Sequence, residues 1–314
     1  MIIRRLGNSP ERNPRGGLEE SDAALILVAM PNSPTLEELQ LLAQQVRRDI
    51  VRMVYGAASG HPGGALGCVE YFLALYGRLL RYDPQNFTLD AKGEDLFILS
   101  NGHISPVWYS VLARFGYFDI EELATFRKIN SRLQGHPATM EGLPGIRLAT
   151  GSLGQGLSVA LGAALAKKMD GEDRLVFCLT GDGELNEGQI WEAAQFAAHH
   201  KIDNLIVTVD LNYKQIDGDT RDVMNPGDLG AKFQSFGWRV HNLKEGNSMS
   251  SVLGCHEEAC KLVGKGKPQV ILMHTVMGKG VDYMEGRYEW HGKPPNDQEY
   301  AAALEQLPEV LADY

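Results

Sequence analysis

The residues best suited to chemistry are an acidic side chain between two glycines and an asparagine further along the chain. Asp182 lies in residues 181–188, Gly-Asp-Gly-Glu-Leu-Asn-Glu-Gly, directly after the apolar run 175–180. Asn212 follows the next apolar run, 205–210. If these runs are neighbouring parallel strands, their carboxyl ends bring both side chains to one crevice. Because Mg²⁺ prefers oxygen donors and shares them with phosphate, the spacing predicts a site for a diphosphate held by a divalent metal.

Both residues also have common structural roles. Asp182 could cap the helix that follows it, and Asn212 could occupy a turn. The metal-site interpretation is favoured because further motifs along the chain support it.

Histidines form a second group of candidates. Four of the nine histidines stand beside glycine in turn-like stretches: His61, His103, His136 and His291. A loop tip with backbone close by suits an imidazole that contacts a small polar ligand. For any one of them alone, a structural hydrogen bond explains the pattern equally well. The others lack this context and are expected to be surface or core histidines: His199, His200, His241, His256 and His274.

The composition limits the classes to which this protein can belong. Of its 314 residues, 44% are hydrophobic and 22% are charged, which is ordinary for one large globular domain or two small ones. A net charge of −10 and a pI near 5.4 argue against a nucleic-acid or anionic-membrane surface, because either needs clustered Lys and Arg. No apolar stretch reaches membrane-spanning length. We expect a cytoplasmic protein whose cysteines, Cys68, Cys178, Cys255 and Cys260, are small buried side chains.

Apolar periodicity predicts the elements that must position the candidates. Thr35 and Glu38 form a capping-box pattern, which predicts a helix from there to about residue 55. A Gly- and Pro-rich turn at 58–64 leads to a second predicted helix that carries Val69 and Tyr76. Strands are expected at 97–99, 175–180, 205–210, 238–242 and 270–276, with helices between them. This alternation predicts an α/β fold with a parallel sheet and helices on both faces. It forms one domain, residues 34–314, after a loosely ordered arm at 1–33.

Several short motifs follow one another in an informative order. They are Ser-Gly-His-Pro-Gly-Gly at 59–64, Leu-Ser-Asn-Gly-His at 99–103, Gly-His-Pro at 135–137, Thr-Gly-Ser-Leu-Gly-Gln-Gly at 150–156, the metal-site stretch at 181–217, and Gly-Lys-Gly-Val-Asp-Tyr-Met-Glu at 278–285 with Trp-His-Gly at 290–292. In this order they resemble the motifs of the N-terminal half of transketolase, and they cover residues 35 to 295. The metal-site stretch on its own resembles the thiamine diphosphate signature.

The resemblance implies a thiamine diphosphate-binding fold and a cofactor site. Asp182, Asn212 and the backbone carbonyl of Lys214 would bind Mg²⁺, or Ca²⁺ or Mn²⁺ in its place. The cofactor-binding residues carried over from the motifs are His103, Ser152, Leu153, Gly154, Gly181, Asp182, Gly183, Glu184 and Asn212. Gly154 lies at the N-terminus of the helix predicted from about residue 157, and helix N-termini favour phosphate.

The resemblance also implies the reaction, the transfer of a two-carbon ketol unit from a ketose donor to an aldose. His61, His103 and His291 would surround the donor carbonyl and its hydroxyl groups as hydrogen-bonding and proton-transfer residues. His136 would hold the terminal hydroxyl of the donor. Glu187 matches a family carboxylate that lies between subunits and links the two active sites, but a negative charge in the first turn of a helix explains it equally well.

The family's second domain, which binds the aminopyrimidine ring of the cofactor, has no counterpart before Tyr314. The chain therefore resembles the N-terminal subunit of a split transketolase. The resemblance implies a pyrimidine-binding partner in a heterotetramer of two plus two, sugar phosphate or related substrates, and a role in carbohydrate metabolism such as the pentose phosphate pathway.

Other interpretations remain open at this point. The α subunit of a 2-oxo acid dehydrogenase also carries the cofactor motif, but it is not expected to have the set His61, His103 and His136. A subunit that holds the cofactor without turnover is a further possibility. Deoxyxylulose-phosphate synthase resembles transketolase more distantly, and the Gly-His-Pro motif favours transketolase.

Overall fold

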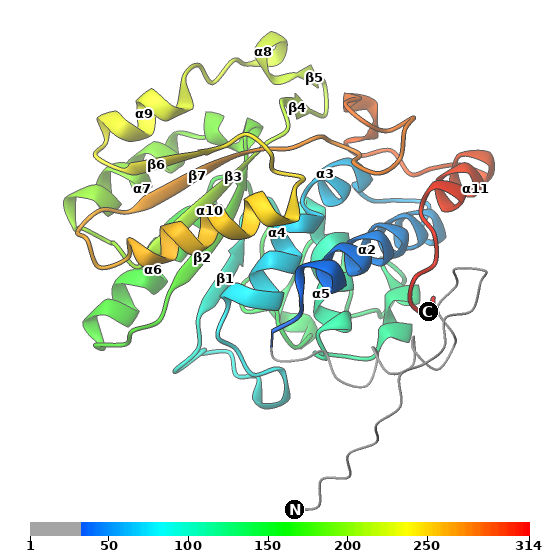
Figure 1. Cartoon of the computed structure of the whole chain (residues 1–314), viewed down its shortest axis with the longest axis horizontal. Helices are drawn as coiled ribbons and strands as arrows, with labels where there is room; N and C mark the ends of the chain where they lie inside the picture. Colours follow the sequence, from blue (N-terminus) through cyan, green and yellow to red (C-terminus); the bar gives the residue numbers. More distant parts are fainter. Residues whose placement is uncertain (1–32) are drawn as a thin grey trace, which may run out of the picture.

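The computed structural model describes residues 33–314, so the predicted arm at 1–33 lies outside the described part except for Ser33. Within it, a sheet of five parallel strands has the order β1-β2-β3-β7-β6 (Figure 1). These strands are β1 (Leu96–Leu99), β2 (Val176–Gly181), β3 (Leu205–Leu211), β6 (Arg239–Leu243) and β7 (Gln269–His274). A short antiparallel hairpin follows β3 and consists of β4 (Lys214–Gln215) and β5 (Gly218–Asp219). The predicted parallel sheet is confirmed, and each predicted strand end lies within two residues of the observed one.

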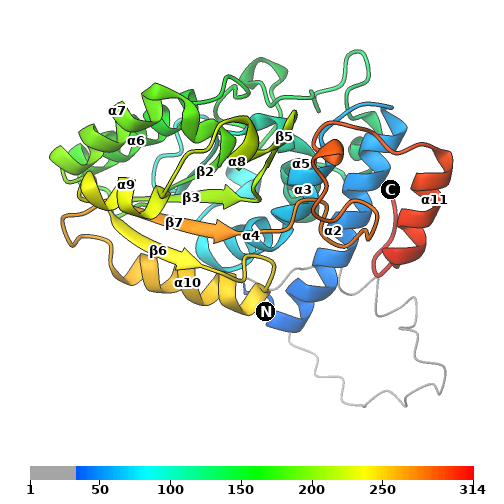
Figure 2. The ribbon, with the colours of Figure 1, turned by 90° about the horizontal axis from the view of Figure 1, so that it is seen from above.

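Helices cover both faces of this sheet, as Figure 2 shows. The helices on one face are α6 (Gln155–Met169), α7 (Gly188–His199) and α9 (Leu229–Ser235). Those on the other face are α2 (Leu36–Gly56), α4 (Val69–Ala74), α5 (Ser105–Arg114) and α10 (Met249–Lys261). Right-handed crossovers explain the division, because the connection through α7 runs from β2 to β3, toward the β6 edge of the sheet, whereas that through α10 runs the opposite way, from β6 back to β7.

The strands are apolar on both sides because each face packs against helices. In β1, Phe97 and Leu99 join the core under α2, α4 and α5, whereas Leu96 and Ile98 join the core under α6 and α7. Side chains alternate between the faces of a strand, so a strand that is covered twice has no polar face. This explains why the strands appear in the sequence as continuous apolar runs.

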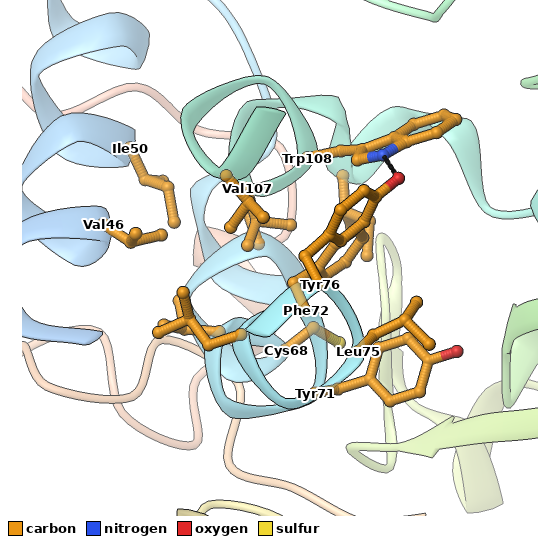
Figure 3. Close-up of a cluster of buried hydrophobic side chains, with 14 of the residues drawn as sticks. Val46, Ile50, Cys68, Tyr71, Phe72, Leu75, Tyr76, Val107 and Trp108 are labelled. Carbon is orange, nitrogen blue, oxygen red and sulfur yellow. Dashed lines mark hydrogen bonds between the residues drawn. The ribbon is translucent and has the colours of Figure 1, made fainter. Parts of the chain in front are cut away.

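Helix α2 begins as its capping box predicts. The Thr35 hydroxyl accepts from the Glu38 backbone N–H at 3.2 Å, and the Glu38 carboxylate accepts from the Thr35 N–H at 2.7 Å. The helix then packs Val46 and Ile50 into a buried cluster with α4 and α5 (Figure 3). In that cluster the Trp108 indole N–H, which would be costly to bury unpaired, donates to the Tyr76 hydroxyl at 2.7 Å.

The prediction of a single second helix is wrong, because the structure divides this segment into three helical pieces. Helix α3 (Pro62–Gly67) ends at Cys68, α4 follows, and a π-helical turn occupies Leu75–Leu79. A side chain at Gly67 would press on the Val276 carbonyl oxygen, 3.0 Å from an added Cβ. Close packing of α3 against this distant loop is a tertiary constraint that periodicity does not reveal. The remaining helices are α8 (Thr220–Val223) and α11 (Asp297–Gln306), the second of which packs on α2.

Two of the four cysteines are buried as predicted. Cys68 and Cys178 are fully buried, but Cys255 and Cys260 on α10 are partly exposed, so the prediction is wrong for that pair. The helix α10 turns these two side chains toward the rim of the core, not into it. None of the helices in residues 33–314 is long and apolar enough to cross a membrane.

His256 on α10 is buried against the sheet and makes the stability of the fold depend on pH. Its Nδ1 lies 2.8 Å from the Val252 carbonyl oxygen and its Nε2 3.0 Å from the Thr208 hydroxyl. Burial lowers the pKa of His256 from 6.5 to about 4. The unfolded chain therefore binds a proton that the folded chain excludes, so the contribution of His256 to stability is full above pH 6.5 and is lost as the pH drops toward 4.

Between pH 7 and pH 5, the free energy of unfolding of the wild type should fall by about 2 kcal/mol more than that of His256→Gln. Urea denaturation at both pH values measures this difference. His241→Gln is the matched control, because His241 is only partly buried, on β6. Identical pH slopes in the wild type and His256→Gln would contradict the prediction.

Candidate active site

A cavity of about 320 Å³ lies at the carboxyl ends of the strands. The sequence-predicted residues that line it are His61, His103, His136, Leu153, Gly181, Asp182, Gly183, Glu184, Asn212, Lys214 and His291. In open α/β sheets, ligands bind outside the carboxyl ends of the strands, which is where this cavity lies. The fold thus brings together residues from loops that are far apart in the sequence.

Asp182 forms the floor of the cavity, at the end of β2. It is 3% exposed. Its Oδ1 accepts from the Gly183 N–H at 2.7 Å, and its Oδ2 accepts from the Tyr213 N–H at 2.7 Å and from the Thr220 hydroxyl at 3.3 Å. Burial, followed by the nearby Asp210 carboxylate, raises the pKa of Asp182 to about 7.

Three carboxylates are buried at this end of the sheet without a cationic side chain to balance them. Asp182, Glu184 and Asp210 are each at most 3% exposed. Among the residues described, each is held by neutral donors and none forms an ion pair. Burial is the first cause of the raised pKa of all three. Buried charge needs a counter-charge, so this donor set fits a bound cation.

Asn212 and Lys214 stand beside Asp182 in the loop after β3. The Asn212 amide donates to Asp210 Oδ2 at 2.7 Å, and its Oδ1 accepts from the Lys214 N–H at 2.9 Å. Residues 33–314 contain no group of three His, Cys, Asp or Glu side chains that could hold a metal. One carboxylate, an amide oxygen and a backbone carbonyl are an incomplete shell, which suits a hard cation such as Mg²⁺ that also takes phosphate oxygens.

Glu184 lines the cavity, and its carboxylate is also hydrogen-bonded to the surrounding backbone. Its Oε1 accepts from the Ser100 hydroxyl and from the Gly154 N–H at 2.8 Å, and its Oε2 accepts from the Gly181 N–H at 3.0 Å. The carboxylate thereby joins the ends of β1 and β2 to the start of α6. Gly154 takes a φ of 84°, a left-handed conformation that favours glycine, as it begins this helix.

Four imidazoles face the cavity from four separate loops. The ring centroid of His61 lies 5.1 Å from that of His103, 5.7 Å from His291 and 6.3 Å from His136. Burial lowers the pKa of each, to about 4 for His61, and the Arg127 guanidinium lowers the pKa of His61 and His136 further. The rings are therefore neutral at physiological pH, so each has one N–H and one lone pair.

Two of these rings have polar atoms available to a ligand. Nδ1 of His61 and Nδ1 of His291 are buried without a hydrogen-bond partner among the described residues. Oδ1 of Asn101 and Nε2 of Gln215, which line the same cavity, are also buried without a hydrogen-bond partner among the described residues. Unpaired buried polar atoms are rare, and four of the ten among the described residues belong to the lining of this one cavity, which indicates the place of a polar ligand.

Three predicted residues lie outside the cavity lining: Ser152, Gly154 and Glu187. Ser152 and Glu187 are both exposed. Glu187 precedes α7 without capping it through its side chain, and an added Cβ at Gly154 would lie 2.8 Å from the Glu187 Cβ. Glu187 is thus a surface residue beside the start of α6.

The structure also adds lining residues to which the sequence assigned no role. They are Gly64, Asn101, Ile104, Gly151, Asp210, Gln215, Ile216 and Met277. Asp210 is paired with Gly181 in the sheet register, so the predicted neighbouring strands carried a signal for it. Met277 had no such signal, because only the packing of its loop against α3 brings it to the cavity.

Comparison with known proteins places this arrangement in a family. The family model described as "Transketolase, thiamine diphosphate binding domain" matches residues 39–308. The chain is 40% identical over 278 residues to one subunit of an apulose-4-phosphate transketolase of Actinobacillus succinogenes, and the match covers 88% of this chain and 98% of the relative. It is 38% identical to a 6-deoxy-6-sulfo-D-fructose transketolase subunit, SqwG, of Clostridium sp., covering 86% and 96%.

Longer transketolases match over part of their length. A solved transketolase of Pichia stipitis in complex with sedoheptulose 7-phosphate superposes with a TM-score of 0.80 at 30% identity, over 86% of this chain and 40% of that one. Human transketolase is 36% identical over 84% of this chain and 41% of its own length. The chain thus spans about two fifths of these enzymes but nearly all of the subunits named above. It belongs to the transketolase family, in which it corresponds to the thiamine diphosphate-binding segment.

Proposed function

We propose that this chain is the N-terminal subunit of a split transketolase that transfers a two-carbon ketol unit from a ketose donor to an aldose acceptor. The observation that carries the proposal is the convergence of four neutral histidines and a buried, cation-free Asp182 on one cavity. Such a cavity can bind a metal diphosphate at its floor and a polyhydroxylated substrate at its mouth. The relatives named above are transketolases, which speaks against a 2-oxo acid dehydrogenase subunit.

The proposed cofactor is thiamine diphosphate with Mg²⁺. Asp182, Asn212 and the Lys214 carbonyl would hold the metal, and the backbone around Gly183 and the loop at Leu153 would border the diphosphate. Ser152 and Gly154, in the same loop, would contribute to diphosphate binding. Glu184 would hold the loop in place through the hydrogen bond that it accepts from the Gly154 N–H. When bound, the cofactor supplies a nucleophilic ring carbon and stabilises negative charge on the substrate fragment.

The histidines would act on the substrate. His103 is almost enclosed by His61 and His291, with ring centroids 5.1 Å and 5.0 Å away, so it suits a fixed hydrogen bond close to the cofactor. His61 and His291, each with an unpaired Nδ1, can accept and return hydroxyl protons of the donor. His136 is exposed at the mouth and would bind the terminal hydroxyl.

The proposed partner is a pyrimidine-binding subunit, in a heterotetramer of two plus two. Support comes from the near-complete coverage of relatives that are themselves called subunits. Exposed apolar side chains on the loops around the cavity, Leu153, Tyr213, Ile216 and Met224, offer a surface for it. Glu187, exposed beside the start of α6, is proposed to lie at a subunit interface.

The substrate class is a phosphorylated or similarly anionic ketose, since named relatives act on a sugar 4-phosphate and on a sulfonated sugar. This chain is strongly acidic overall, so local donors must bind such an anion. The described cysteines are all free thiols, which supports a reducing compartment, and we propose the cytoplasm.

The test is a two-substrate assay with the full chain, its candidate second subunit, thiamine diphosphate and Mg²⁺. We expect a ketose two carbons longer than the acceptor to form from a panel of ketose phosphate donors and aldose acceptors. Mass spectrometry of the products identifies the transferred unit. Cofactor binding without any ketol transfer across the panel would leave the non-catalytic alternative as the better explanation.

Kinetics of two histidine variants should separate binding from proton transfer. His136→Ala is expected to raise the KM for the donor, because His136 lies at the mouth. His291→Ala is expected mainly to lower kcat, by about 100- to 10,000-fold, which is typical for loss of a general acid or base. His241→Ala, on β6, is the control. Wild-type constants in either variant would remove that residue from its proposed role.

A further inference from the structure

Tyr213 lies between two proposed metal-binding residues, Asn212 and Lys214, and its backbone is strained. Its φ is 62°, in the left-handed region that residues with a Cβ rarely adopt. In this conformation the Tyr213 N–H donates to Asp182 Oδ2 at 2.7 Å. The Tyr213 carbonyl oxygen accepts from the Thr220 N–H at 3.0 Å. Strained backbone persists only where the surroundings fix it, so the anchors of Tyr213 matter to the metal site.

The third anchor is the side chain of Tyr213, which is hydrogen-bonded to the sheet. Its hydroxyl oxygen lies 2.5 Å from Nδ1 of His274, the last residue of β7. Nε2 of His274 lies 2.6 Å from Oδ1 of Asn242 in β6. Because an amide oxygen can only accept, Nε2 carries the proton, and Nδ1 accepts from the Tyr213 hydroxyl. Two hydrogen bonds of fixed direction thus connect the strained residue to two strands.

We propose that His274 is a positioning residue of the metal site, which acts through Tyr213. It fixes the Tyr213 side chain, and with it the backbone of residues 212–214 and the N–H that holds Asp182. Tyr213 is 50% exposed, and its hydroxyl has no other partner among the described residues, so without His274 the ring is free to turn. Segment 212–214 can then relax away from Asp182. This inference rests on the proposed function, since it presupposes that Asp182, Asn212 and Lys214 bind the metal.

A second cavity, of about 630 Å³, gives direct access to this chain of hydrogen bonds. Tyr213, His274, Asn242 and Asp182 all line it. Truncation of His274 to alanine would enlarge this cavity by the volume of an imidazole ring. Added imidazole can therefore reach the vacated position and restore the partner of the Tyr213 hydroxyl.

The experiment measures the Mg²⁺ concentration at half-maximal thiamine diphosphate binding, by calorimetry on the full chain purified with its second subunit. We expect His274→Ala and Tyr213→Phe each to raise it about tenfold, the lower end of the range for groups that orient metal ligands. The double variant should need the same Mg²⁺ concentration as either single variant, because both substitutions break the same series of hydrogen bonds. Imidazole should restore affinity in His274→Ala but not in the double variant.

His241→Ala is the matched control, because the His241 ring is likewise hydrogen-bonded to a side chain, that of Gln269, but lines neither cavity. If His274→Ala fails to fold, Tyr213→Phe decides, since it removes only a hydroxyl. Unchanged Mg²⁺ dependence in Tyr213→Phe and His274→Ala, with a loss in Asp182→Ala, would overturn the positioning role and leave the proposed function standing. Unchanged Mg²⁺ dependence in Asp182→Ala would instead refute the metal site itself.

Discussion

Replacement of Asp182 by alanine is expected to weaken Mg²⁺-dependent binding of thiamine diphosphate by more than about 100-fold. Loss of a group that only orients a metal ligand typically costs 10- to 100-fold, and Asp182 is proposed as a ligand itself and as the charged member of the set. Asn212→Ala removes a neutral oxygen donor, so we expect a smaller loss in the same direction. Calorimetry on the assembled complex gives both affinities.

Asp182→Asn separates this effect from damage to the fold. The amide keeps the volume of the side chain and removes a buried charge whose pKa burial already raises to about 7. In the absence of metal, Asp182→Asn relieves the buried charge but turns an amide NH2 toward one of the two backbone N–H donors, from Gly183 or Tyr213. Its loss of stability in urea denaturation should therefore stay within about 1–3 kcal/mol, although it no longer binds the cofactor tightly. Glu192→Gln, which changes an exposed carboxylate on α7 that has no proposed role, is the matched control. Wild-type cofactor affinity in Asp182→Ala, Asn212→Ala and Asp182→Asn would refute the metal assignment.

The second large effect expected is the absence of ketol transfer by this chain alone. The chain corresponds to only 40–41% of the solved and curated single-chain transketolases named above. The resemblance to transketolase implies that the partner holds the aminopyrimidine ring of the cofactor and supplies a glutamate that activates it. A cofactor held only by its diphosphate would also leave its reactive ring open to water. Addition of the second subunit should restore activity by several orders of magnitude.

Coupled assays of the two isolated subunits, and of their mixture at increasing ratios, measure this dependence. Activity should saturate near one copy of each subunit, and light scattering should give the mass of a two-plus-two complex. Substitution of the exposed Ile216 by Lys should weaken association, whereas Leu89→Lys, also exposed but on the loop before β1, should not. Full ketol transfer by this chain, freed of any co-purified partner, would show that the split-subunit proposal is wrong.

The sequence by itself determined the parallel sheet, the start of α2 and the convergence of most candidate residues on one cavity. Local chemistry explains this success. The capping box of Thr35 and Glu38 is formed within one turn of helix, and strands covered on both faces must be apolar throughout. Because parallel strands end at one edge, the residues that follow each run, Asp182 and Asn212 among them, had to meet there.

Only the tertiary structure decided how these residues are supported. Glu184 joins three segments that are distant in the sequence, and Asp210 adds a buried charge whose effect on Asp182 depends on the register of β2 and β3. His274 has no motif around it, yet strand order places it against Tyr213. Short-range patterns fix backbone elements and types of chemistry. Burial, strain and the pairing of polar atoms depend on which distant side chains the packed sheet brings together, and these set the electrostatics of the site.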